Sequence, residues 1–209
     1  MRDSSSVGWL GFIARSHQAF NARAFGDFAA MRHIDDELRA SLHDRGDKLN
    51  LAIQLAAGSA FLALLDDDSA ASDRLLDEAA GAFEGQTPDV VAYLVAWQRA
   101  QNARYSADSE TSADIIQNFL KSHRHLRMFF HCRLFLGVAE GLPLTVAETR
   151  RGRRRLKTLI RQLANEPCLN ARAFSSLLYA GAVYTERPAE AYARLQTAIS
   201  RFEQVGCAA

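Results

Sequence analysis

The sequence predicts an all-α protein, and three observations support this fold class. Turn and capping residues recur at intervals of roughly twenty residues, so each segment between them has the length of one helix. The chain of 209 residues contains four prolines, and none of them interrupts a long apolar run. No segment alternates between polar and apolar residues strictly enough to indicate a β-strand.

Each expected helix lies between residues that stop one helix or cap the next. The first run, VGWLGFIA, follows a single arginine and an aspartate and has no clear cleavage signal, so it predicts a helix rather than a signal peptide. The breakers are GD at 26–27, RGD at 45–47, DDDS at 66–69, GQTP at 85–88, ADS at 107–109, GLP at 141–143, NEP at 165–167 and ERP at 186–188. The boundary near residue 124 has no breaker. The expected helices are 6–24, 27–44, 48–65, 69–84, 88–106, 109–123, 125–140, 146–164, 169–185 and 189–205.

Two stretches of the chain share a pattern of small and aromatic residues. AGSAF at 57–61 and AGAVY at 180–184 each place an aromatic residue three positions after a glycine, and each precedes an alanine-rich helix and a Phe-Glu pair. Such a glycine lets a neighbouring helix approach closely, and the aromatic residue covers the contact. Ala191 and Ala198 share one face of the last helix. These features predict a tetratricopeptide-like α-solenoid of about five helical hairpins, as a single domain over 1–209, with chance agreement between alanine-rich helices as the alternative.

Three longer stretches resemble a known family. They are DELRASLHDRGDKLNLAIQLAAGSAFLALLDDD, PDVVAYLVAWQRAQNARYSAD, and the series RRLKTLIRQLANEP, ARAFSSLLYAGAVY and AYARLQTAISRFEQVG. They resemble the C-terminal helical-repeat region of large bacterial signalling proteins that join a serine/threonine kinase domain to an AAA-type, STAND-like ATPase. The resemblance implies an interaction module of the bacterial cytoplasm, and a fragment or shortened relative of a larger protein. The sequence contains no GxxxxGK[ST] phosphate loop and no HRD-type catalytic segment.

Charge is distributed unevenly along a chain whose formal net charge is +1. Between Asp27 and Asp89 there are 14 Asp or Glu against 5 Lys or Arg, and the later half carries an excess of arginine. Such asymmetry can orient partners or subunits, or it is a solvated surface whose charge drifts. Cys132, Cys168 and Cys207 form no CxxC pair, so we expect reduced thiols in a cytoplasmic protein. No run approaches the ~18 apolar residues of a membrane span, so no membrane partner is expected.

The strongest local feature is TRRGRRRLKTLIRQ at 149–162, in which seven of fourteen residues are basic. All its candidate partner-binding residues but Arg151 fall within about 60° of one another on a helical wheel, opposite a stripe of leucine and isoleucine. This face can dock phosphates, meet an acidic protein surface, or lie in solvent while arginine stems cover apolar neighbours. Aromatic residues do not interleave with the arginines, which argues against stacking on single strands. The candidate residues are Arg150, Arg151, Arg154, Lys157 and Arg161.

Two other stretches are weaker candidates for a site. HRHLRMFFHC at 123–132 contains potential metal ligands, but its three histidines do not converge on one helical face, and its arginines oppose a cation. DDDSAASD at 66–73 lacks the spacing of a calcium loop, and helix capping by Asp68 or Ser69 explains it better. No GxSxG nucleophile elbow is present, and we expect no catalytic residue, metal site or cofactor.

The aromatic residues of the first segment have two interpretations. They line a peptide groove or oligomer contact, or they form the capping core of a repeat array, which we favour. They are Trp9, Phe12, Phe20, Phe25 and Phe28.

The function that we expect follows from the basic helix and the repeat pattern. The sequence predicts a non-enzymatic protein–protein interaction or regulatory module, with a protein partner or self-association. The alternative is a nucleic-acid-binding adaptor that uses the basic helix at 146–164.

Overall fold

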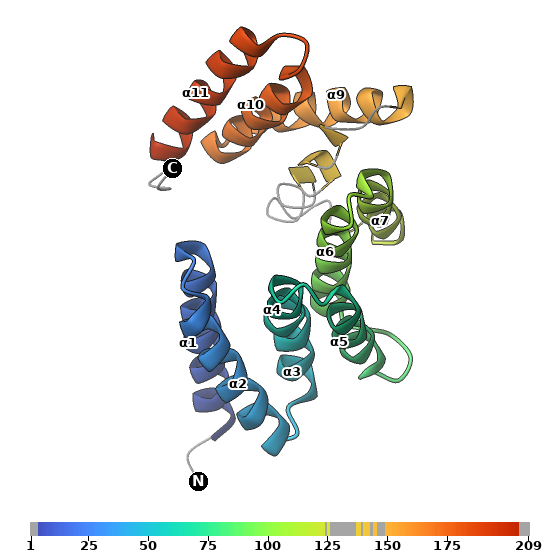
Figure 1. The fold of residues 1–209 in the computed structure, drawn as a ribbon. Coiled ribbons are helices and arrows are strands. Elements are labelled where there is room, and N and C mark those ends of the chain that lie inside the picture. The colour runs from blue at the N-terminus through green and yellow to red at the C-terminus, as the bar shows by residue number, and fades with distance from the viewer. Residues whose placement is uncertain are drawn as a thin grey trace. The chain divides into compact units, whose positions relative to one another are not determined.

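The computed structural model of the chain is all-α, as the sequence predicts. It describes residues 4–123, 125, 137–138, 140–142, 144–145 and 149–204, and none of these lies in a strand. The chain forms two compact units, residues 1–102 and residues 103–209, whose division falls within helix α6, Asp89–Tyr105 (Figure 1). In a repeat array each hairpin contacts only its neighbours, so a single array can also divide into two compact units. The expectation of one domain over 1–209 therefore stays a prediction.

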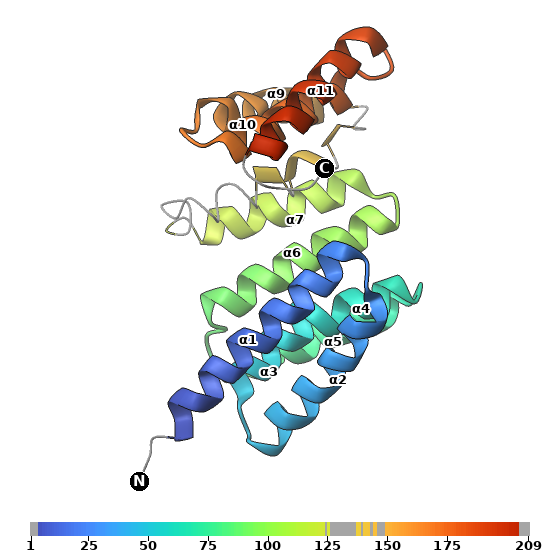
Figure 2. The same ribbon diagram turned by 90° about the vertical axis from the view of Figure 1, so that its left-hand side faces the viewer.

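Unit 1, residues 1–102, is a series of helical hairpins. Its elements are α1 (Ser4–Phe25), α2 (Phe28–Asp44), α3 (Lys48–Gln54), the π-helical turn η1 (Leu55–Ser59), α4 (Ala60–Leu65), α5 (Ser69–Gly81) and the greater part of α6. The helices α1 and α2 lie side by side as one hairpin (Figure 2). The expected helix at 48–65 is divided by the π-helical turn. The helix expected at 69–84 ends early, at Gly81.

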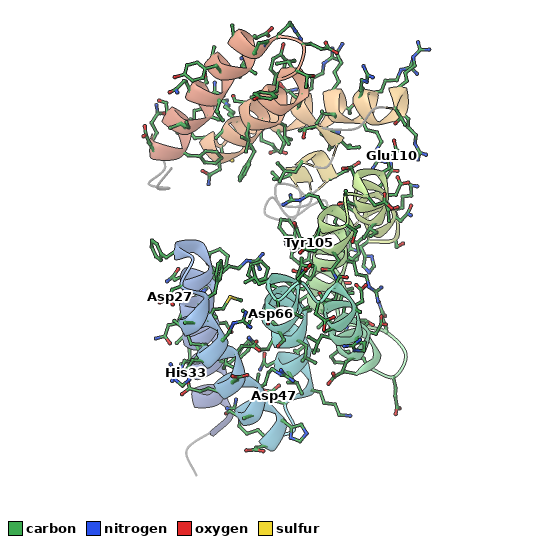
Figure 3. All side chains as sticks on the ribbon, viewed as in Figure 1. Asp27, His33, Asp47, Asp66, Tyr105 and Glu110 are labelled. Atoms are coloured by element: carbon green, nitrogen blue, oxygen red, sulfur yellow. The ribbon has the colours of Figure 1, made fainter. Side chains whose placement is uncertain are left out.

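Aspartate caps set where three of these helices begin. Asp27, Asp47 and Asp68 each accept a hydrogen bond from the backbone N–H three residues later, at 2.7–3.2 Å. Asp27 and Asp47 lie near the two ends of α2 (Figure 3). Asp66 instead forms an ion pair with Arg32 of α2, and the hydrogen bond from this guanidinium lowers the pKa of Asp66. The acidic residues of this stretch therefore cap and connect helices, as expected for Asp68.

The core of unit 1 forms where α3, η1 and α4 pack against α5. Leu55, Leu76 and Val91 are buried there. The segment Lys48–Leu65 is the one described stretch that is long and apolar enough to cross a membrane, with a mean hydropathy of 1.5 over 18 residues. Half of it is buried within the structure, as in a core helix. The sequence contains no uninterrupted apolar run as long as a membrane span, as expected, but this segment reaches the length and average hydropathy of one.

A buried carboxylate lies beside the π-helical turn. Asp35 of α2 is 3% exposed, and it accepts hydrogen bonds from Gln54 Nε2 at 2.6 Å and from Ser59 Oγ at 2.9 Å. Burial raises the pKa of Asp35, and the two hydrogen bonds offset this rise in part. A Cβ on Gly58 would lie 2.7 Å from Asp35 Oδ1 and even closer to Gln54 Nε2. The polar centre of unit 1 is therefore an acid held by neutral donors, in a space that requires glycine.

Unit 2 comprises residues 103–209. Its described helices are α7 (Ser109–Ser122), α9 (Arg150–Asn165), α10 (Leu169–Val183) and α11 (Pro188–Gln204). The last three pack in succession, α9 against α10 and α10 against α11. Leu144, Leu156, Leu163 and Leu178 are buried in its core. The expected helix at 146–164 begins at Arg150 in the described part of the chain. The expected helix at 125–140 lies largely outside the described residues.

The two glycine–aromatic stretches differ in structure. Gly58 lies in the π-helical turn and approaches α2, whereas Gly181 lies in regular α10, where a Cβ would be 2.9 Å from Cγ2 of Thr145. The ring of Phe61 packs against an aromatic ring of α2, whereas Tyr184 is 68% exposed. Both glycines have a close neighbour, but the approach of another helix, as predicted, is present at Gly58, whereas Gly181 meets Thr145 in a turn. The aromatic cover is present in the first stretch alone.

Candidate anion-binding face of helix α9

Helix α9 has one buried side and one strongly cationic side. It begins after Thr149, whose Oγ1 accepts a hydrogen bond from the backbone N–H of Gly152 at 3.1 Å. Leu156 and Leu163 are buried in the core of unit 2, which fixes the side that faces inward. Its 16 residues include seven Lys or Arg and no acid. The amphipathic helix predicted from the sequence is confirmed.

One of the seven basic side chains, Arg155, is turned inward and neutralised. Its guanidinium donates to Glu140 Oε1 through Nε at 3.0 Å and through Nη2, and to Asp114 Oδ1 through Nη1 at 2.8 Å. Nη2 also donates to the carbonyl of Ala113 at 3.1 Å. Burial by itself lowers the pKa of Arg155, but the bonds and charges of Glu140 and Asp114 outweigh it, and the pKa is raised. Arg155 therefore connects α7, α9 and the segment that contains Glu140.

The outward side chains gather around a groove of about 470 Å³ that is lined by Arg150, Arg153, Arg154 and Lys157. No carboxylate of the described residues lines it, and among these residues Arg150, Arg154 and Lys157 have no ion-pair partner. The structure thus brings together three of the predicted residues and adds Arg153, which the wheel places beside them.

The two remaining candidate residues lie outside the groove lining. Arg161 is exposed further along α9, on the same face by helical spacing. Arg151 points toward α7, where its Nη2 lies 3.9 Å from Asp114 Oδ1. Arg151 is 72% exposed, so this long contact neutralises it weakly. The strongest concentration of uncompensated charge is therefore in the groove.

The beginning of α9 is electrostatically unfavourable by itself. The partial positive charge at a helix N-terminus favours acidic side chains, and α6, α7 and α11 carry Asp89, Glu110 and Glu190 in their first turns. The first turn of α9 carries arginines and no acid. Like charges three or four residues apart also repel one another. A bound anion would relieve both effects.

The cationic excess of unit 2 is confined to this helix. Residues 103–209 contain 16 Lys or Arg and 9 Asp or Glu, a formal charge of +7. Helix α9 contributes all seven, so the remainder of the unit carries nine of each sign. Residues 1–102 contain 9 Lys or Arg and 15 Asp or Glu, a formal charge of −6. The net formal charge of unit 2 is therefore equal to that of α9, although 121–133 holds four further basic residues and no acid.

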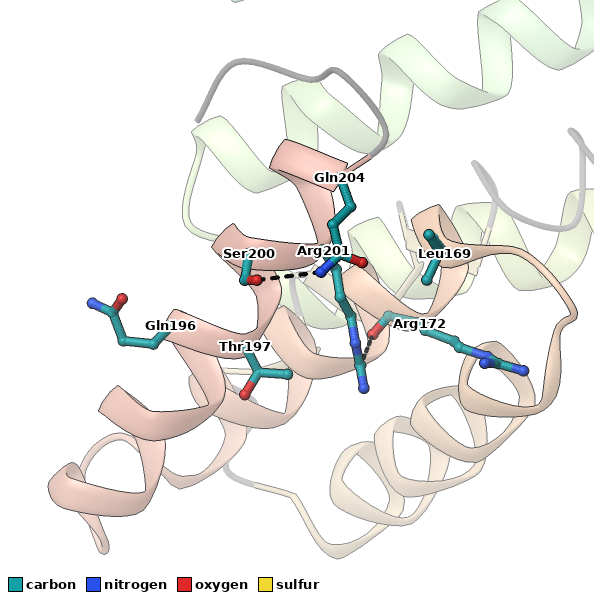
Figure 4. A pocket seen from close by; sticks show the side chains of 7 residues that line it. All are labelled: Leu169, Arg172, Gln196, Thr197, Ser200, Arg201 and Gln204. Atoms are coloured by element: carbon teal, nitrogen blue, oxygen red, sulfur yellow. Dashed lines mark hydrogen bonds between the residues drawn. The ribbon is translucent and has the colours of Figure 1, made fainter.

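A second hollow, between α10 and α11, also contains arginines but is less suited to an anion. It encloses about 510 Å³ and is lined in part by Arg172 and Arg201 (Figure 4). Arg201 already donates to the carbonyl of Arg172 at 2.9 Å and to Ser176 Oγ at 2.8 Å. Arg172 donates to the carbonyl of Glu166 at 3.3 Å. These arginines join α10 to its neighbours, whereas Arg150 and Arg154 of the α9 groove form no such side-chain bond among the described residues.

The weaker candidates of the sequence have mixed outcomes. His123 stacks on Phe119 at a centroid distance of 4.2 Å, while His131 and Cys132 lie outside the described residues. No cluster of three or more His, Cys, Asp or Glu side chains suited to a metal occurs among the residues that the structure describes.

The aromatic residues of α1 and α2 do not form one core. Phe12 is 5% exposed and buried, as a capping core predicts, whereas Phe20 and Phe25 are 68% and 84% exposed. Phe28 is partly exposed, and the side chain of Trp9 lies outside the described part. The preferred interpretation is therefore correct for Phe12 and wrong for Phe20 and Phe25.

Comparison of the chain with protein-family models, with curated proteins and with solved structures finds no match. The functional argument therefore rests on the residues and their geometry.

Proposed function

We propose that the protein is a non-enzymatic, helical-repeat interaction module that binds an acidic segment of a protein partner on the outer face of α9. The groove lined by Arg150, Arg153, Arg154 and Lys157 carries this proposal. The proposal includes, as the scaffold, the tetratricopeptide-like solenoid predicted from the repeated glycine–aromatic pattern. It also includes a bacterial cytoplasmic signalling setting, which rests on the sequence resemblance alone.

The chemistry of the groove suits an acidic protein segment. Exposed arginines contribute strongly to protein interfaces because a guanidinium forms several directed hydrogen bonds and is weakly hydrated. Charge complementarity also accelerates encounter and rejects partners of the wrong sign. Since Arg155 already has its acids inside unit 2, the outer cations are the ones that a partner can neutralise.

Nucleic-acid binding is the second candidate function, and the same four cations favour it. Two observations make it the weaker one. From Arg150 to Arg161 the cationic face extends about 16 Å along the helix, a length that spans only about five phosphates of one duplex strand. In addition, residues 1–102 carry a formal charge of −6, which repels a long polyanion more than a short acidic segment.

Fluorescence anisotropy on the full chain separates the two functions. The probes are a short labelled glutamate-rich peptide, a labelled duplex DNA and a labelled single-stranded RNA, each titrated at several salt concentrations. The proposal predicts that the peptide binds more tightly than either nucleic acid and that binding is lost in the variant Arg150→Glu, Arg154→Glu, Lys157→Glu. Tighter, steeply salt-dependent binding of the duplex or the RNA would establish the adaptor instead.

A further inference from the structure

The groove of α9 has a more specific chemistry than general positive charge. Arg153 and Arg154 each lie three or four residues from both Arg150 and Lys157, so the four side chains gather on one side of the helix. Seven residues separate the first from the last, a rise of about 10 Å. Four cationic side chains are therefore concentrated over a length that matches one small polyvalent anion and its nearest neighbours.

We propose that this groove binds a phosphorylated side chain in the partner's acidic segment. The inference rests on the proposed function and names its ligand: a phosphoserine, phosphothreonine or phosphotyrosine rather than a run of carboxylates. The arginines supply forked donors for the phosphoryl oxygens, and Lys157 supplies a compact charge. Clusters of arginine are a recurring means of phosphopeptide recognition.

A phosphoryl group satisfies the groove better than a carboxylate does. It carries a charge of about −1.5 to −2 at neutral pH and three acceptor oxygens, whereas a carboxylate carries one charge and two oxygens. Arg150, Arg154 and Lys157 have no ion-pair partner among the described residues, so each retains donors for the ligand. The same dianion would also lie near the N-terminal end of α9, where a helix favours negative charge.

The confinement of the charge favours a phosphopeptide over a nucleic acid. Outside α9, unit 2 has nine basic and nine acidic residues, so the rest of the unit adds no net charge that would attract the further phosphates of a long strand. A peptide with one phosphoryl group requires no such continuation. Arg155, held by Glu140 and Asp114, supplies no further cation to extend the site.

The test is a titration of the full chain with three labelled peptides of identical acidic sequence, which carry serine, aspartate or phosphoserine at the central position. We expect the phosphoserine peptide to bind about tenfold more tightly than the aspartate peptide, since it adds charge and charge-assisted hydrogen bonds. The variant Arg150→Gln, Arg154→Gln, Lys157→Gln should remove this preference. A control variant, Arg104→Gln, Lys121→Gln, Arg194→Gln, removes three exposed cations elsewhere in unit 2 and should retain it.

The outcomes separate this inference from the proposed function. Equal affinity for the phosphoserine and aspartate peptides overturns the phosphoryl site but leaves an acidic-segment module. Binding of no peptide overturns both. A phosphoserine preference that the control variant loses as fully as the groove variant also overturns the site, since it would show attraction by overall charge. Tighter binding of labelled duplex DNA than of any peptide identifies a nucleic-acid surface.

Discussion

The two units each bury a carboxylate, but they compensate its charge in different ways. In unit 1, Asp35 is 3% exposed and is held by the neutral donors Gln54 and Ser59. In unit 2, Glu140 is 7% exposed and is paired with the guanidinium of Arg155. Neutral donors leave burial dominant and the pKa of Asp35 raised, whereas in unit 2 the hydrogen bonds and charges of Glu140 and Asp114 outweigh burial and raise the pKa of Arg155. The comparison predicts different responses to mutation and to pH.

The contrast extends to the two sides of α9. Arg155 forms its ion pairs inside unit 2, while Arg150, Arg154 and Lys157 face outward without ion-pair partners among the described residues. Removing the inward arginine should damage the fold, and removing the outward cations should not. The predictions below follow that order, from the largest expected effect on stability to the smallest.

The largest effect is expected for Arg155→Met. The change leaves Glu140 buried without its cation, and loss of one partner from a buried pair costs about 3–5 kcal/mol. Urea unfolding followed by circular dichroism measures the loss. Arg154→Met on the exposed face is the matched control, with an expected change within about 0.5 kcal/mol. Equal losses in the two variants would contradict the distinction between the faces.

Gly58→Ala tests the corresponding centre of unit 1. The new Cβ would collide with Gln54 and approach Asp35 Oδ1 to 2.7 Å, so we expect a loss of about 1–3 kcal/mol in the free energy of unfolding. Gly81→Ala is the control, because a Cβ there meets nothing within 4 Å. Alanine also has the better helix propensity, so the control should lose no stability. A harmless Gly58→Ala would show that the π-helical turn has room to relax.

Asp35→Asn sharpens the comparison through its pH dependence. Since burial raises the pKa of Asp35 in the folded state, the folded protein binds this proton more tightly than the unfolded chain does. Ionisation therefore removes stability as the pH rises from about 3.9, the ordinary value, through the raised folded pKa. The asparagine variant lacks this contribution. The stability of the wild type relative to the variant should thus fall as pH rises; parallel profiles from unfolding at several pH values would refute this.

The helices were predictable from the sequence because their signals are local. The cap at Asp68 could be predicted from neighbouring residues alone. The same is true of the face shared by Ala191 and Ala198, two residues that are buried in the structure. The π-helical turn was not predictable in this way. It lies where Asp35 meets Gln54 and Ser59 across a hairpin, and the helical period of 48–65 is compatible with a continuous α-helix.

The cationic groove was partly predictable. Helical spacing placed Arg150, Arg154 and Lys157 together, and the structure agrees. The inward ion pairing of Arg155 was harder to predict, because Glu140 and Asp114 lie 15 and 41 residues away along the chain. The helical wheel does not single out Arg155: at 100° per residue Arg153 lies at least as close to the apolar stripe, yet Arg153 lines the groove.

The most direct measurement of the central claim compares stability with binding in the variant Arg150→Gln, Arg154→Gln, Lys157→Gln. These cations repel one another and two of them lie near the positive end of α9, so their removal should raise the free energy of unfolding by a few tenths of a kcal/mol each. Binding of the phosphoserine peptide should be lost in the same protein. That result would show a surface kept for a ligand at the expense of the fold. A clear loss of stability with unchanged peptide binding would contradict the account and make the cationic face a structural one.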